Sequence, residues 1–430
     1  MVEMTVVERL VKAFAEKFGR EPEIISSAPG RLDFLNTHQD YKGLPVVSIA
    51  INKRTYVAVS KRADNMARVF SLNLCEEGTA CQDSFDASKP SLLEKGWFGN
   101  YIRSVTKALL DYGVDIKGFD LAILSEIPVA SGLASSAALQ VATVNALLTL
   151  HGLNLPPGEI AELAYRSEHD IMGIPCGRLD QYGSSFGGIA VIETRPPYKT
   201  RVINKAWFKL VAVNSGIKHS TGAIHPIRIA EIEKGLTDLL SLPDLPPRIR
   251  SLIGKSVYET KWEELSLEEL ASFLERIEEN PGKRIVFTLK MHLSTTLALR
   301  LLEDKSSKVA SEVISLIEKE CPRCIDEASK ASTTELLALG AIVNYQHALL
   351  RDLYDVSLPE LEAIREKALE AGAIGVKISG AGLGGALLAL VEDERNGVKV
   401  VEKVISNAKG AWLVEIDEGA RIDWRSPSTR

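Results

Sequence analysis

Apolar residues recur along this chain at helical and at strand spacing, so both kinds of element are expected. The first segment, residues 4–18, carries one apolar face and is followed by Gly19, a residue type that commonly ends helices. We therefore predict a helix over this segment. Its apolar face consists of Val7, Leu10, Val11, Phe14 and Phe18.

Short apolar runs bounded by turn residues predict strands, mainly in the first half of the chain. Turn signals stand at Pro29-Gly30 and at Lys42-Gly43. The predicted strands cover residues 23–28, 45–51, 54–60, 119–124, 188–193 and 209–214.

Helical spacing dominates the second half, where a strand–glycine loop–strand unit over residues 375–391 interrupts it. We expect a mixed α+β chain of two lobes, residues 1–195 and 196–430, with a soft linker near Arg195. The predicted helices after the first cover residues 97–112, 135–151, 158–170, 224–240, 264–278, 284–302, 308–318, 334–352 and 358–371.

The stretch from Ile127 to Gly158 contains no charged residue, which raises the question of a membrane span. A span needs about 20 consecutive and mainly apolar residues. This stretch is broken by Pro128, Gly132 and Pro156-Pro157, so we interpret it as a strand, a glycine loop and a buried helix. No membrane partner is expected.

Composition narrows the possible partners further. With 51 basic and 57 acidic residues the net charge is −6, and no basic patch indicates nucleic acid as a partner. Because Glu3 and Glu8 interrupt any apolar stretch at the start, we expect a cytoplasmic protein without a secretory signal. Cys321 and Cys324 have the spacing of metal ligands, but no second pair completes a zinc site. Two interpretations of this pair stay open, a turn that carries two free thiols or a disulfide.

Three glycine-rich loops are candidates for binding chemistry. Residues 128–138 lie between a predicted strand and a buried helix, where helix-start N–H groups suit an anion. Neither a P-loop nor a hydrolase elbow matches this loop. Residues 378–386 are not a dinucleotide loop, because an apolar, strand-like run follows them. In residues 173–181, Asp180 taken alone is typical of a turn or helix cap.

The order of these segments resembles the GHMP kinases, a family of small-molecule kinases, and most closely its galactokinase branch. The segment Ala28-Pro-Gly-Arg-Leu-Asp33, followed by His38-Gln-Asp-Tyr41, is similar to the branch's signature. Residues 168–181 match its acidic segment nearly throughout. Some motifs, such as Gly30-Arg-Leu-Asp33, are closer to L-arabinokinases. The resemblance covers roughly residues 24–392.

This resemblance implies an N-terminal lobe with a ribosomal-S5-like core and a ferredoxin-like C-terminal lobe, with the active site between them. It implies an enzyme that uses ATP and Mg²⁺ to phosphorylate the anomeric hydroxyl of a sugar. The sugar and ATP would be its partners, and the chain would act as a monomer or a homodimer.

The resemblance also assigns residues to roles. Asp180 would be the base or orienting carboxylate, with Arg31 beside it, and both would be catalytic. Ser136 and Glu168 would hold Mg²⁺, because hard oxygen ligands suit that ion. The sugar would contact Arg31, Thr37, His38, Asp40 and Asp180. The nucleotide would contact Trp97, Gly132, Leu133, Ala134, Ser135, Ser136 and Ala137.

One departure from the family pattern bears on the substrate. Galactokinases carry Gly-Glu before the histidine, where this chain has Asn36-Thr37. Because that Glu contacts the 6-hydroxyl, galactose and a related sugar both stay open. The alternatives are L-arabinose, galacturonate or an amino sugar. A sensor that binds sugar and ATP without turnover is the remaining alternative, against which the intact catalytic set argues.

Overall fold

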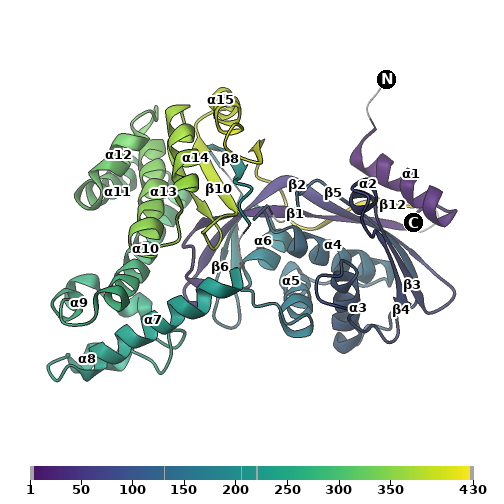
Figure 1. The fold of residues 1–430 in the computed structure, drawn as a ribbon, viewed down its shortest axis with the longest axis horizontal. Coiled ribbons are helices and arrows are strands. Elements are labelled where there is room, and N and C mark those ends of the chain that lie inside the picture. The colour runs from purple at the N-terminus through teal and green to yellow at the C-terminus, as the bar shows by residue number, and fades with distance from the viewer. Residues whose placement is uncertain (1–3, 130, 205, 219–220, 427–430) are drawn as a thin grey trace.

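The computed structural model describes residues 4–129, 131–204, 206–218 and 221–426, and it consists of two lobes lying side by side (Figure 1). Each lobe is built on one sheet with helices packed against it. This mixed content of helices and strands confirms the predicted α+β class.

An eight-stranded sheet forms the first lobe. Its strands are β1 (Ile24–Leu35), β2 (Val46–Lys61), β3 (Met66–Ser71), β4 (Gln82–Asp86), β5 (Phe119–Ser125), β6 (Ile189–Ile192), β7 (Thr200–Ile203) and β12 (Arg421–Arg425). The main order is β12-β1-β2-β5-β3-β4, and β6 pairs with β2 and carries β7. The two longest strands, β1 and β2, are antiparallel, with Arg31 opposite Ala50.

Helices cover both faces of this sheet, because successive side chains of a strand point to opposite faces. On one face, Val57 and Val59 of β2 pack with the helices α3 (Asn100–Tyr112), α4 (Ser135–Leu150) and α5 (Pro157–Arg166). On the other face, Tyr56 and Ala58 pack with α1 (Val6–Phe18). The short helix α2 (Leu72–Glu76) lies beside β5, and α6 (Leu179–Phe186) packs on β1 and β2.

The N-terminal helix is confirmed as α1. Thr5 caps its start, with the Thr5 hydroxyl accepting from the Glu8 N–H and the Glu8 carboxylate accepting from the Thr5 N–H. Gly19 ends it in a left-handed conformation, with φ of 75°.

The uncharged stretch is confirmed as a loop and a buried helix, whereas the strand that leads into them, β5, ends at Ser125, before the stretch begins. Its helix, α4, is apolar on all sides because it packs against β1 and β2 and also against α3, α5 and α6. A different helix, α10 (Glu279–Asp304), has an 18-residue window of mean hydropathy 1.3, long and apolar enough to cross a membrane. In this fold 56% of that window is buried inside the protein, as in the core helix of a folded domain.

The second lobe contains a four-stranded antiparallel sheet of β8 (Lys209–Asn214), β9 (Gly375–Ser379), β10 (Ala386–Val391) and β11 (Gly410–Val414). The strand order is β11-β8-β10-β9, with helices between β8 and β9 and between β10 and β11. This β-α-β-β-α-β arrangement is the ferredoxin-like pattern that was expected. The other helices of this lobe are α7 (Thr221–Ser241), α8 (Pro247–Leu252), α9 (Leu267–Leu274), α11 (Ser307–Glu320), α12 (Pro322–Ala328), α13 (Thr334–Asp352), α14 (Pro359–Glu370) and α15 (Glu394–Val404).

Two of the predicted strand boundaries are wrong. The runs 45–51 and 54–60 form one continuous strand, β2, and β1 continues through Pro29-Gly30 instead of turning there. The register of β1 against β2 shifts between these two residues. A side chain at Gly30 would lie 2.7 Å from the Leu133 carbonyl oxygen, and the neighbouring Arg31 N–H donates to that same oxygen at 3.1 Å. The glycine thus allows Leu133 of the glycine loop to approach the strand.

The predicted division at residue 195 stays a prediction. Two segments beyond it, β7 and β12, belong to the sheet of the first lobe. The chain therefore returns at its end to the lobe in which it began, as the neighbouring α1 and β12 in Figure 1 show.

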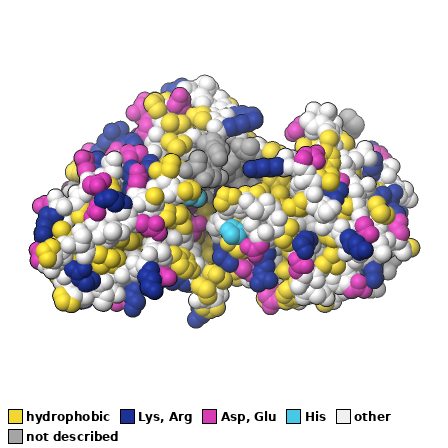
Figure 2. Space-filling view, turned by 60° about the horizontal axis from the view of Figure 1, so that its bottom comes forward, with side chains coloured by type: hydrophobic (Ala, Val, Ile, Leu, Met, Phe, Trp, Pro, Cys, Tyr) yellow, Lys and Arg dark blue, Asp and Glu magenta, His cyan; other side chains and the backbone are white. Residues whose placement is uncertain are grey.

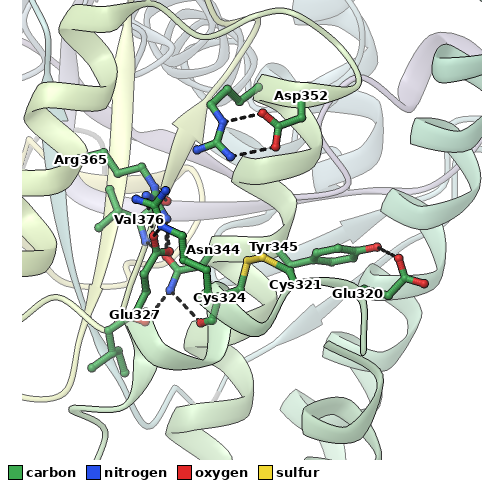
Figure 3. Close-up of a disulfide and its surroundings, with 12 residues drawn as sticks. Glu320, Cys321, Cys324, Glu327, Asn344, Tyr345, Asp352, Arg365 and Val376 are labelled. Atoms are coloured by element: carbon green, nitrogen blue, oxygen red, sulfur yellow. Dashed lines mark hydrogen bonds and ion pairs between the residues drawn. A yellow bond between two sulfur atoms is a disulfide. The ribbon is translucent and has the colours of Figure 1, made fainter. Parts of the chain in front are cut away.

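Two cysteine pairs form disulfides, Cys75–Cys81 and Cys321–Cys324. The Cys75–Cys81 disulfide was not predicted from the sequence. The Cys321–Cys324 disulfide is one of the two alternatives that the sequence left open for that pair. Figure 3 shows the second pair at the start of α12, next to Asn344 of α13. The Asn344 amide donates to the carbonyls of Cys324 and Ile374, and so ties α12 and α13 to the segment entering β9.

Candidate active site

A pocket of about 140 Å³ lies between the lobes, where the end of β1, the loop before α6 and the loop between β9 and β10 meet. Figure 2 shows the hollow between the lobes, with histidine side chains at its surface. The pocket is lined by all five predicted sugar-contacting residues: Arg31, Thr37, His38, Asp40 and Asp180.

Arg31 and Asp180 form an ion pair in this pocket. Arg31 Nε donates to Asp180 Oδ1 at 2.8 Å, and Arg31 Nη2 lies 2.6 Å from the same oxygen. The remaining nitrogen, Nη1, donates to the Gly132 carbonyl at 2.7 Å. Asp180 stands in the first turn of α6, where a carboxylate is favoured by the helix dipole. One guanidinium therefore connects the carboxylate to the glycine loop.

The glycine loop is wedged between the two lobes. Gly132 has a φ of 78°, and a side chain there would lie 2.9 Å from the Ala386 nitrogen at the start of β10. The helix α4 begins at Ser135, so its first N–H groups have no acceptor within the helix. These are the backbone N–H groups of Ser135, Ser136 and Ala137. Leu133 and Ala134 precede them in the loop, and Ala130 lies outside the described residues.

Glu168 lies beside this loop, in a π-helical turn, Ser167–Ile171, of the kind often found at functional sites. Its carboxylate accepts from Gln181 Nε2 at 2.7 Å, and the nearby Ser136 side chain acts to lower the pKa of this carboxylate. Burial, and then the nearby Asp180 carboxylate, raise the pKa of Glu168 to about 7. The two predicted metal ligands are therefore neighbours.

These donors fit a magnesium ion. A buried carboxylate and a hydroxyl are hard oxygen ligands of the kind that this ion prefers. No cluster of three His, Cys, Asp or Glu side chains suited to a metal occurs among the described residues. The fit therefore depends on phosphate oxygens as further ligands, the usual arrangement for this ion.

Trp97 does not line the pocket. It precedes α3 and packs against Phe98, with ring centroids 5.0 Å apart. Its buried indole N–H has no hydrogen-bond partner in the part of the chain that the structure describes. The predicted contact of Trp97 with adenine stays a prediction.

His38 is held at both ring nitrogens. Nε2 lies 3.0 Å from the Ala381 carbonyl of the β9–β10 loop, and the Tyr41 hydroxyl lies 3.3 Å from Nδ1. Burial lowers the pKa of His38 well below its usual value, so the ring is neutral and donates from Nε2 to Ala381. The Tyr41 hydroxyl is in turn bonded to that of Tyr354. Binding of a sugar hydroxyl by His38 stays a prediction that requires one of these bonds to open.

Thr37 belongs to a buried polar cluster that the sequence did not predict. Its hydroxyl accepts from Lys377 Nζ at 2.9 Å and donates to Asp33 Oδ1 at 3.0 Å. Lys377 also donates to the Asp33 carbonyl at 3.1 Å, and the Asp33 N–H donates to Ser379 Oγ at 2.8 Å. Burial lowers the pKa of Lys377 to about 8 and raises that of Asp33. Asp33 lines the pocket next to Thr37.

Asp40 opens a short 3-10 helix, Asp40–Lys42, at the opposite side of the signature segment. A side chain at Gly177 would lie only 1.9 Å from Asp40 Oδ2, so the glycine makes room for this carboxylate. Burial raises the pKa of Asp40. The Gly/Pro-rich loop thus serves to place Asp40 as well as Asp180.

Three family models match this chain in succession. They are the galactokinase galactose-binding signature over residues 12–61, the GHMP kinases N terminal domain over residues 100–188, and the GHMP kinases C terminal domain over residues 330–410. The matched segments contain the signature, the glycine loop with the acidic segment, and the late glycine loop.

Relatives match over most of the chain. A galactokinase from Chloroflexus aurantiacus is 30% identical over 395 residues, which cover 90% of this chain and 89% of that protein. A galactokinase from Streptomyces coelicolor is 30% identical over 417 residues, which cover 95% and 93%.

Solved structures agree with these relatives. Lactococcus lactis galactokinase, determined in complex with galactose, is 27% identical with a TM-score of 0.75, covering 97% of this chain and 100% of that one. Mevalonate kinase from Methanococcus jannaschii shares the fold at 20% identity, with a TM-score of 0.57 and coverage of 93% and 100%.

Proposed function

Because this chain belongs to the galactokinase family of the GHMP kinases, we propose that it transfers the γ-phosphoryl group of ATP to the anomeric hydroxyl of galactose or a closely related sugar. The observation that carries the proposal is the contact of Arg31 with both Asp180 and the Gly132 carbonyl. This contact places a base, a cation and a phosphate-binding loop around one point between the lobes.

Asp180 serves as the base or orienting carboxylate for the anomeric hydroxyl. Its ion pair with Arg31 orients the carboxylate, and Arg31 also balances charge on the transferring phosphoryl group. Phosphoryl transfer depends mainly on positioning and electrostatic stabilisation. The fixed geometry of the pair suits that requirement.

The nucleotide phosphates bind at residues 132–137, at the start of α4. The free N–H groups of a helix start and the positive end of its dipole favour anions. The close packing of Gly132 against β10 fixes this loop before the nucleotide arrives.

Ser136 and Glu168 hold Mg²⁺, which when bound neutralises phosphate charge. Replacing Glu168 by Gln removes the carboxylate ligand but keeps an amide oxygen that can accept the hydrogen bond from Gln181. We expect this variant to need a higher Mg²⁺ concentration for half-maximal rate, measured as ADP release at saturating ATP. An unchanged Mg²⁺ titration would assign Glu168 a structural role.

The pocket disfavours an anionic sugar. Asp33, Asp40 and Asp180 line it, while Arg31 is already paired and Lys377 is engaged by Thr37 and Asp33. Among the described residues that line the pocket, an anionic acceptor such as galacturonate would face carboxylates without a free cation. Galactose, L-arabinose and an amino sugar remain as acceptors. Asp33 supplies the carboxylate beside Thr37 in the pocket that would receive them.

The test is a panel of galactose, L-arabinose, galacturonate and galactosamine, incubated with ATP and Mg²⁺ while ADP is measured. We expect steady ADP release with at least one of the other three sugars and none with galacturonate. Binding of sugar and ATP without any ADP release would support the sensor alternative.

The setting of the reaction is proposed on sequence grounds. The chain works in the cytoplasm as a monomer or homodimer on two small molecules, without nucleic acid or a membrane as partner. The net charge of −6 is consistent with this.

A further inference from the structure

A second, larger compartment of about 610 Å³ adjoins the catalytic pocket. Its size lies within the range of about 300–1,000 Å³ that is typical of ligand pockets. The two cavities share Asp40, residues 175–177 and His225 as a common wall. Arg31 and Asp180 line the catalytic pocket but not this compartment. The compartment therefore lies on the side of the sugar away from the reacting oxygen.

Aromatic side chains form its far wall, which includes Tyr165 and Tyr198. The Arg178 guanidinium packs on both rings, 4.0 Å from the centroid of Tyr165 and 3.8 Å from that of Tyr198. Glu162 accepts two hydrogen bonds of 2.9 Å from the same guanidinium. Arg178 is thus fixed, its charge is compensated, and its guanidinium covers one face of each ring. His169 also stacks on Tyr165, with ring centroids 4.9 Å apart, so Tyr198 is the ring of this pair with a face that these groups leave uncovered, in a wall with little net charge.

The segment that carries Tyr198 is also held in place. Tyr198 has a φ of 55°, a conformation that is costly for a bulky residue unless its surroundings enforce it. The Tyr198 N–H donates to the Arg195 carbonyl at 2.9 Å, and Arg195 Nη2 donates to the Tyr258 carbonyl at 3.1 Å. The Tyr258 hydroxyl donates to the Thr194 carbonyl at 3.0 Å. The wall is therefore preformed, as ligand sites usually are.

The chemistry of the compartment suits a neutral sugar ring and not a nucleotide. None of its lining residues belongs to the described part of the glycine loop, and its one arginine, Arg178, is already paired. The C–H faces of a pyranose ring are apolar and pack well on aromatic rings. The hydroxyls of Tyr165 and Tyr198 form no hydrogen bond with any described residue, so they remain available to a sugar hydroxyl.

We propose that this compartment binds the second ring of a neutral disaccharide whose reducing-end sugar occupies the catalytic pocket. The proposal rests on the proposed sugar kinase activity and extends its substrate class. Because the shared wall contains Asp40 and not Asp180, the second ring is linked to a hydroxyl remote from the anomeric carbon.

The reaction would be the same transfer on a larger acceptor. The anomeric O–H bond breaks and its proton passes to Asp180 and then to solvent. A bond forms between that oxygen and the γ-phosphorus, and the bond from the γ-phosphorus to the bridging oxygen of ATP breaks. The products are a disaccharide 1-phosphate, ADP and a proton.

The experiment compares galactose with three galactobioses, linked 1→3, 1→4 and 1→6, as acceptors for the full chain with ATP and Mg²⁺. ADP release gives the rates, and mass spectrometry identifies the phosphorylated disaccharide. We expect kcat/KM for at least one galactobiose to exceed that for galactose by about tenfold or more, through a lower KM.

Two variants and a control assign the effect to the compartment. Tyr198→Ala removes a stacking ring, and Ile229→Trp fills the space from α7. Each should lower kcat/KM for the preferred galactobiose about tenfold more than that for galactose. The matched control is Tyr112→Ala, which removes an exposed tyrosine on α3, outside the compartment lining.

The outcomes separate this proposal from the one on which it rests. Phosphorylation of galactose but of no galactobiose would overturn the disaccharide site and leave the sugar kinase intact. A preferred galactobiose that is unaffected by both variants would also overturn the site. Absence of ADP release with every sugar would overturn the proposed kinase activity itself.

Discussion

Asp180 is the residue on which the proposed chemistry depends, because its charged carboxylate faces the pocket and is oriented by Arg31. Asp180→Asn keeps the shape and removes the charge and the basicity. General base catalysis contributes about 10²–10⁴ in rate, so kcat should fall by that order while ATP binding persists. Steady-state ADP release and calorimetric ATP binding measure the two quantities.

A matched control for this variant is Asp115→Asn, which changes an exposed carboxylate paired with Lys117. It should leave kcat within about twofold, because exposed ion pairs contribute little. Retention of more than about a tenth of kcat in Asp180→Asn would show that Asp180 is not the base.

Asp33 is a second carboxylate that lines the pocket, and the sequence did not predict it as a site residue. Its carboxylate lies beside Thr37 and lines the pocket, and so can accept a hydrogen bond from a sugar hydroxyl. For Asp33→Asn we expect kcat/KM to fall by about tenfold or more for galactose and by clearly less for 6-deoxygalactose. An equal loss on both sugars would assign Asp33 a structural role in the Thr37–Lys377 cluster.

At the level of elements, the loop before α6 places two of the three acidic residues that line the pocket, Asp40 and Asp180. Gly177→Ala would put a methyl group within 1.9 Å of Asp40 Oδ2 and so displace that carboxylate. We expect a rise in the sugar KM of about tenfold, with ATP binding unchanged, measured by initial rates and by ATP titration.

Gly158→Ala is the control for this change. It lies in the first turn of α5, where the nearest atom to an added side chain is 3.7 Å away. Its kinetics should match those of the native chain. A Gly177→Ala variant that also matches them would mean that Asp40 does not bind the sugar.

Sequence spacing predicts most of the helices and strands of the two lobes, and its failures have physical reasons. The glycine loop before α4 is predictable because small residues and an uncharged helix mark a close backbone approach in a buried setting. The continuation of β1 through Pro29-Gly30 cannot be predicted from the sequence, because it depends on the Leu133 carbonyl about a hundred residues away in the chain.

The contact of Asp33 with Lys377 could not be predicted either, because it joins residues separated by 344 positions. One signal was present: Lys377 stands as the single charged residue in β9, a short strand that is buried throughout. A charged residue in a buried strand requires a partner, but the pattern does not say which.

In the whole molecule, the lobes are joined by polar contacts that also build the pocket. Lys377 and Ser379 of β9 bind Asp33 of β1, and Ala381 binds His38. The chain end adds a second tie, since Asp417 pairs with the buried Arg54 at 2.7 Å before β12 pairs with β1. Residues from both lobes thus complete one site.

The most direct test of the central claim is the position of the phosphate in the product. The full chain, galactose, ATP and Mg²⁺ are incubated together, and the product is examined by ³¹P and ¹³C NMR. The account predicts galactose 1-phosphate, with phosphorus coupled to the anomeric carbon and no other phosphorylated sugar. A phosphate on any other hydroxyl, or no phosphorylated sugar with any neutral acceptor in the panel, would contradict it.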